Sequence, residues 1–278
     1  THLARLYQVG GQPHRHRPWL CVPSTRLMAI HSLSVQLLAL TPPPLRTDTL
    51  RPGVLLRLGG FGATAGPLVD AVHNQALLRY DVLPVSLPLP LGEARTSLLI
   101  PPLLALTYAL LGGALPAAAE RVVGTRRLST MAEYAPPARA AAAVASTVAI
   151  IKLSEILQLS ALAPSSSLAL LAIACTIQWA ALDGTLASAV LALLVGLVGP
   201  LAELPFIFAG AWHYLPEAAD YVPLGLDPSW AALSSITGPC YCAVTLDSIA
   251  LGRCFAAFAA DERSLGPAAA AEGDMLDR

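Results

Sequence analysis

The stretch that decides the fold, residues 165–212, reads SSSLALLAIACTIQWAALDGTLASAVLALLVGLVGPLAELPFIFAGAW. It contains two apolar runs, Leu168–Leu182 and Thr185–Leu204, which meet at Asp183-Gly184. Each run approaches or reaches the length of about 20 apolar residues that a helix needs to cross a bilayer core. Neither run has the polar stripe of a soluble amphipathic helix. The stretch therefore predicts an antiparallel pair of membrane helices joined by a tight turn.

Composition extends this interpretation to the whole chain. Of its 278 residues, 55% are hydrophobic and 13% are charged, whereas about a quarter of a soluble domain is charged. The net charge is −1, so no basic field favours nucleic acid as a partner. The five cysteines are an odd number and lie mostly in apolar runs, which indicates small buried thiols and not a disulfide framework.

The rest of the chain is consistent with an all-α, polytopic bundle of six spans. Residues 53–256 form the predicted membrane domain, and residues 257–278 form an acidic, Ala-rich tail. Gly62 and Gly66, four residues apart in the first span, predict close approach of a second helix. The expected spans are Gly53–Val72, Ser97–Leu115, Arg139–Ala163, the two helices of the 165–212 stretch, and Ser229–Leu251.

Residues 1–52 differ from the rest, with six arginines and one acidic residue, Asp48. Arginine, serine and proline with almost no acid are typical of an organelle-targeted N-terminus. Residues 26–40 have the length of a short helix lying on the membrane, and a surface-docked coil is an equal alternative. With six spans, most arginines fall on the side of both termini, which predicts that both termini face the cytosol or an equivalent compartment such as the stroma.

Charged residues inside the predicted spans are candidates for function, because an ion in a bilayer normally pairs or lines a cavity. Lys152 and Glu155 lie three apart on one helix, and Asp247 lies in the last span. The simpler interpretation is a Lys152–Glu155 pair that holds the bundle together. The alternative is a path for protons or ions through a transporter.

The sequence contains no strong catalytic constellation. Asp183-Gly-Thr-Leu-Ala187 begins like the CDP-alcohol phosphotransferase motif, but the further carboxylates needed to hold a metal are missing. We therefore expect a protein that is not an enzyme and has no metal site. His73 and His213 are candidate ligands for the magnesium of chlorophyll. With Asn74 and Trp179 they form the predicted pigment- or lipid-binding set, for chlorophyll, carotenoid or a structural lipid.

Three short segments resemble the Insig family of six-span, sterol-binding membrane proteins that hold a partner membrane protein. Trp179–Asp183 is similar to the end of the family's fourth span, and Thr245–Arg253 to its exit from the sixth. The segment from His213 through Tyr221 to Trp230 resembles the aromatic loop between them. The resemblance implies that Asp183 contacts a partner and that a lipid-like ligand lies among spans one, three, four and five. Gly184 departs from the family, which has a basic residue there.

These observations lead to two main hypotheses. The first is a non-catalytic accessory subunit of a larger organellar complex, specifically a photosynthetic complex of the chloroplast thylakoid. In it, Arg15, Arg17 and Asp183 contact other membrane-protein subunits, and lipid or pigment binds on the helix faces. The alternative is an Insig-type regulator in the endoplasmic reticulum that binds sterol or lipid and controls a partner membrane protein.

Overall fold

The computed structural model describes the backbone of residues 49–89, 92–123 and 136–276, all of which belong to the unit formed by residues 46–278. The predictions for residues 26–40 and for most of the 1–52 extension lie outside the described residues. Within the described ranges, five helical stretches have the length and composition needed to cross a membrane: Ile100–Val123, Pro136–Gln158, Pro164–Leu182, Leu186–Phe208 and Thr237–Asp261. The chain is thus a mostly helical, polytopic membrane protein.

The first predicted span is divided into two helices, α2 (Pro52–Thr64) and α3 (Gly66–Leu77). Pro67 supplies no N–H, and its ring clashes with the preceding turn, which explains the interruption at Ala65. Neither helix alone has the length of a bilayer core, so six spans are not established. The close approach predicted from Gly62 and Gly66 is confirmed, since a Cβ on either glycine would overlap Leu104 of the neighbouring helix.

The second span is a continuous helical stretch with an altered middle. It consists of α4 (Ile100–Ala109), a π-helical turn η1 (Leu110–Ala114) and α5 (Leu115–Val123). Pro116 lies two residues after the π turn. A proline removes the hydrogen bond to the carbonyl four residues before it, which here is that of Gly112. The wider turn accommodates this disruption without ending the helix.

The central stretch folds into α7 (Pro164–Leu182) and α8 (Leu186–Ala202), joined by a three-residue turn as predicted. Gly184 adopts a positive φ of 61°, and the Thr185 side chain caps α8 by accepting a hydrogen bond from the Ser188 N–H. Beyond the turn the two helices separate. α7 packs on α6 (Pro136–Gln158), whereas α8 packs mainly on α11 (Thr237–Leu276).

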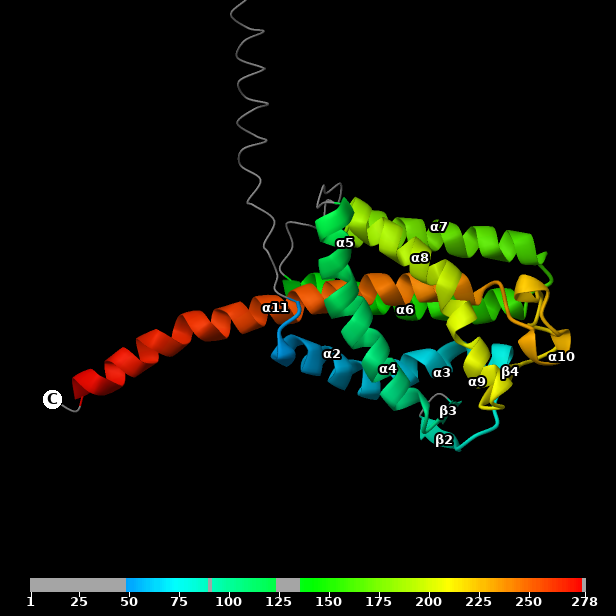
Figure 1. Ribbon diagram of the computed structural model, residues 1–278, viewed down its shortest axis with the longest axis horizontal. Helices are drawn as coiled ribbons and strands as arrows, with labels where there is room; N and C mark the ends of the chain where they lie inside the picture. Colours follow the sequence, from blue (N-terminus) through cyan, green and yellow to red (C-terminus); the bar gives the residue numbers. More distant parts are fainter. Residues whose placement is uncertain (1–48, 90–91, 124–135, 277–278) are drawn as a thin grey trace, which may run out of the picture. The chain divides into compact units, whose positions relative to one another are not determined.

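Helix α11 is the central element of the bundle, packing against α2, η1, α6, α7 and α8 (Figure 1). It begins at Thr237, eight residues later than the sixth span was expected to begin. The preceding residues instead form the short helix α10 (Pro228–Ala231) and an extended bridge between Tyr221 and Leu233. The predicted C-terminal tail continues the backbone of α11 as far as Leu276.

Short strands correct the expectation of an all-helical chain. Strand β1 (Leu78–Tyr80) pairs antiparallel with β4 (Trp212–Tyr214), although more than 130 residues separate them. Strands β2 (Pro84–Leu89) and β3 (Gly92–Ser97) form a hairpin. The connection after α8 contains α9 (Leu204–Phe208) and the 3-10 turn η3 (Pro223–Gly225).

Two glycines allow the backbones of α11 and η1 to come close together. A Cβ on Gly252 of α11 would overlap the carbonyl oxygen of Gly112 in η1, and a Cβ on Gly112 would overlap the Ser248 carbonyl oxygen. Small residues let membrane helices approach in this way because packing, and not expulsion of water, drives their association. The π turn and α11 are therefore held at a separation that admits no side chain.

We expect Gly252→Ala to destabilise the protein, because the added methyl group meets backbone atoms that cannot rotate away. The expected loss is about 1–3 kcal/mol, measured as a lower unfolding midpoint of the purified protein in detergent. The control is Gly60→Ala in α2, where a Cβ meets no atom within 4 Å. That change should leave the midpoint unchanged or raise it, and equal losses in both variants would contradict the close-contact interpretation.

Candidate functional site

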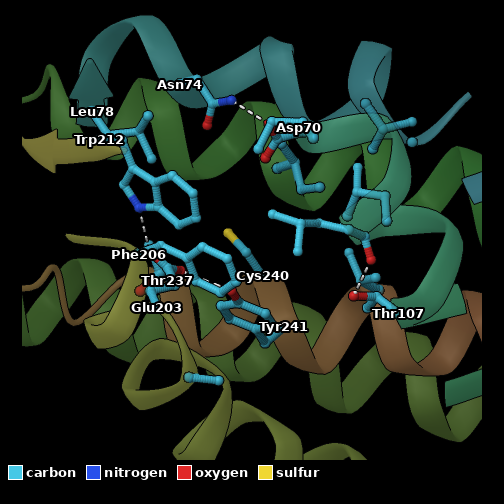
Figure 2. A pocket seen from close by; sticks show the side chains of 18 of the residues that line it. Asp70, Asn74, Leu78, Thr107, Glu203, Phe206, Trp212, Thr237, Cys240 and Tyr241 are labelled. Carbon is cyan, nitrogen blue, oxygen red and sulfur yellow. Dashed lines mark hydrogen bonds between the residues drawn. The ribbon is translucent and has the colours of Figure 1, made fainter. Parts of the chain in front are cut away.

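A cavity of about 230 Å³ lies inside the bundle. Its walls come from α3, α4, α6, the end of α8, and α11, and strands β1 and β4 close one end (Figure 2). Most of the lining is aliphatic or aromatic. A small set of polar side chains gathers at the end near the strands: Asp70, Asn74, Tyr80, Glu203, Trp212, Tyr214 and Tyr241.

The alternation of the β1–β4 pair places aromatic rings toward this cavity. Tyr80 pairs with Trp212 and Leu78 with Tyr214, and all four line the cavity. The intervening pair, Arg79 and His213, is exposed. The two strands therefore form a small cover with an aromatic inner face.

The carboxylate of Glu203, at the end of α8, binds three donors from different parts of the chain. Its Oε2 accepts hydrogen bonds from Tyr214 at 2.8 Å and from the Trp212 indole at 3.2 Å, and its Oε1 accepts one from Tyr241 at 2.8 Å. Glu203 is only 9% exposed. These donors supply the hydrogen bonds that a buried carboxylate requires, and they join α8, β4 and α11 at one point.

Asp70 of α3 forms the second polar group. Its Oδ2 accepts hydrogen bonds from the Tyr80 hydroxyl at 2.7 Å and from the Asn74 amide Nδ2. The same Nδ2 donates to the Tyr80 oxygen at 2.8 Å. Burial, and then the nearby Asp70 charge, raises the pKa of Tyr80, so this phenol stays protonated and donates.

A second hollow opens where α7 and α8 separate. It is a groove of about 660 Å³ over α11, with largely apolar walls. Trp179 lies in its wall and donates a hydrogen bond to the Thr185 carbonyl at 2.9 Å, so the indole also closes the α7–α8 turn. Of the four predicted pigment- or lipid-binding residues, Trp179 lines the groove and Asn74 lines the internal cavity.

The Asp183 side chain forms an ion pair within the chain. It bonds the Arg253 guanidinium, whose other nitrogen lies 2.7 Å from Glu120 of α5. The Thr185 hydroxyl also donates to Asp183, which is 6% exposed. The Asp183–Arg253 ion pair thus joins two of the Insig-like segments, residues 179–183 and 245–253. The contact of Asp183 with a partner protein stays a prediction.

The predicted intramembrane charges separate into two environments. Lys152 and Glu155 form an ion pair on α6, but the Lys152 side chain is 53% exposed and neither residue lines the cavity. Asp247 is fully buried in α11, accepts a hydrogen bond from Tyr108 at 3.3 Å and lies beside Ser248. The structure therefore does not bring the three together in one path.

Of the two histidine candidates, only His213 has a described side chain, and it lies outside the cavity lining. His213 is exposed on β4, and its Nδ1 lies 2.6 Å from a carboxylate oxygen of Asp81. The side chain of His73 and the residues Arg15 and Arg17 lie outside the described residues. Among the residues that the structure describes, no group of three or more histidine, cysteine or acidic side chains is arranged to hold a metal ion.

Sequence reasoning did not identify Glu203, Asp70 or the tyrosines as site residues. Glu203 sits at the end of an apolar run, where an ionisable residue is a signal of function. Trp212 and Tyr214, which donate hydrogen bonds to it, lie on β4. Their convergence depends on the β1–β4 pairing, which no local pattern in the sequence indicated.

The fold and cavity define a polytopic membrane protein with a hollow, partly polar interior. Its fold is similar to that of a mycobacterial Insig homologue, MvINS from Mycobacterium vanbaalenii. The crystal structure of MvINS, and that of a cross-linked MvINS trimer, each superimpose with a TM-score of 0.54 and 21% sequence identity. Each alignment covers 74% of this chain and 95% of MvINS. No protein-family model and no curated protein sequence matches the chain.

The resemblance to the Insig family inferred from short segments is thereby confirmed at the level of the fold. The ligand location implied by that resemblance, among spans one, three, four and five, stays a prediction. Helix α7, the fourth predicted span, contributes nothing to the described lining of the internal cavity, whereas α4 and α11 do. Helix α7 lines the outer groove instead.

We expect Glu203→Leu to lower stability strongly, because three buried donors would lose their acceptor. The expected loss is about 2 kcal/mol or more. Thermal unfolding in detergent measures it, with exposed Glu217→Leu as the control. A loss no greater than that of the control would show that the Glu203 cluster does not support the bundle.

A double-mutant cycle tests the Asp183–Arg253 pair. Arg253→Met alone should cost about 3 kcal/mol, since it leaves the buried Asp183 charge unpaired. Adding Asp183→Asn should recover part of this loss, because the two changes share one interaction. The control is Arg95→Met, whose exposed pair with Glu93 should contribute at most about 1 kcal/mol. Strictly additive effects at Asp183 and Arg253 would contradict the pairing.

Proposed function

We propose that this protein is a non-catalytic, Insig-type membrane protein that binds a lipid in its internal cavity and thereby regulates a partner membrane protein. The observation that carries the proposal is the cavity itself. It combines apolar walls with a small polar end, which is the usual construction of a site for a small amphiphilic ligand. The fold shared with an Insig homologue supports the same function.

Lipid is the ligand class that the surroundings favour. The cavity is bounded by helices long and apolar enough to cross a membrane, including α4, α6 and α11. A ligand that enters between such helices comes from the bilayer, so its main part must be apolar. The polar end then orients it, since buried polar groups are stable only when they are hydrogen-bonded.

The endoplasmic reticulum membrane is the location we propose with this function. The fold comparison gives no support to a chloroplast thylakoid complex or to pigment binding. The exposed His213 also bonds a carboxylate instead of facing the cavity. We therefore favour the Insig-type regulator over the chloroplast subunit, and isolating the chain from its native membrane would identify the partner protein.

A cavity-filling substitution tests lipid binding. Thr107 lines the cavity from α4, whereas its neighbour Leu106 is 59% exposed. We expect lipid to co-purify with the wild-type chain in mild detergent, as measured by extraction and mass spectrometry. Thr107→Phe should abolish that retained lipid, because the ring occupies the cavity, and Leu106→Phe should not. Equal lipid content in the two variants, both folded, would refute the proposed site.

A further inference from the structure

Asn74 presents an unused hydrogen-bond acceptor to the cavity. It is 1% exposed, and its Oδ1 has no hydrogen-bond partner among the described residues. The orientation of the amide follows from its neighbour, because a carboxylate only accepts and Nδ2 must therefore face Asp70. Figure 2 shows the amide oxygen turned away from Asp70 and toward the interior.

The other acceptors at this end are already engaged. Glu203 binds three donors, and Asp70 binds two. A buried acceptor left without a donor is costly, so the open position at Asn74 suits a donor that arrives with the ligand. Asp70 acts here as a positioning residue, since it fixes which amide atom faces the cavity.

The charge of the site limits what that donor can be. No lysine, arginine or histidine occurs among the described residues that line the cavity, whereas two acidic residues do. An anionic headgroup would therefore be buried without a counter-charge beside two carboxylates. An ammonium carries three donors, whereas the Asn74 Oδ1 is the one buried side-chain acceptor without a partner among the described residues that line the cavity. A hydroxyl supplies one donor and no charge.

We propose that Asn74 determines the ligand specificity of the cavity, its Oδ1 accepting a hydrogen bond from the hydroxyl group of an uncharged lipid. This inference rests on the proposed lipid-binding function. It assigns the donor group of the ligand and the atom that recognises it. Removing that hydroxyl while keeping the apolar chain should weaken binding about tenfold, the usual effect of one unmade hydrogen bond at a buried site.

The test uses the full chain in detergent and four lipids with the same alkyl chain. These are 1-hexadecanol, hexadecyl methyl ether, hexadecylamine and palmitate, titrated at one pH with binding measured by native mass spectrometry. We expect the alcohol to bind about tenfold more tightly than the ether. In Asn74→Leu the two should bind equally. Gln75→Leu should keep the preference, because this neighbouring amide side chain is exposed and lies outside the cavity lining.

The outcomes separate this inference from the function on which it depends. Equal binding of alcohol and ether by the wild-type protein would overturn the role of Asn74 and leave lipid binding intact. Tightest binding of palmitate or hexadecylamine would overturn it as well. Binding of none of the four would refute the cavity as a site for such lipids, and with it the proposed function. The alcohol–ether comparison needs no variant, so it remains decisive if Asn74→Leu does not fold.

Discussion

The hydrogen bonds to the Glu203 carboxylate are the interaction on which the rest of the structure depends. A carboxylate inside a membrane bundle is tolerated only when donors surround it, and here the donors come from β4 and α11. Satisfying Glu203 thus fixes Trp212 and Tyr214 on the strand and Tyr241 on the central helix. The same side chains form the polar end of the cavity, so the cluster that stabilises the bundle also lines the cavity.

The main features of the fold could be predicted because bilayer-spanning helices leave a strong signal in composition. The run from 165 to 212 indicated two membrane helices and the turn at Gly184, and both are present. The division of the first span at Ala65 was missed, although Pro67 was visible in the sequence. The late start of α11 was missed because residues 229–236 are as apolar as a membrane helix. They instead belong to the short helix α10 and to an extended bridge at Leu233.

The site was less predictable, because it depends on contacts between distant segments. Asn74 was selected as a pigment- or lipid-binding candidate and Asp247 as a charge inside a predicted span, and both are buried. The convergence of Asp70, Glu203 and Tyr241 on one cavity depends on how α3, α8 and α11 pack, which periodicity alone does not specify. Lys152 and Glu155 show the opposite case, since a charge inside an apolar helix need not face the interior when its partner is one turn away.

The central position of α11 has a consequence for the order in which the protein assembles. Synthesis runs from the N-terminus, so α11 leaves the ribosome after α2, α6, α7 and α8, the helices that pack against it. Until then Glu203 lacks its hydrogen bond from Tyr241, and Asp183 lacks its ion pair with Arg253. The π turn η1 also lacks its contact with Gly252. Before α11 is made, the earlier helices lie in the membrane without these contacts. A chain that ends before Thr237 therefore exposes the carboxylates of Glu203 and Asp183 to the machinery that removes unassembled membrane proteins. Once α11 is complete, Tyr241 and Arg253 bind these carboxylates, and both are buried.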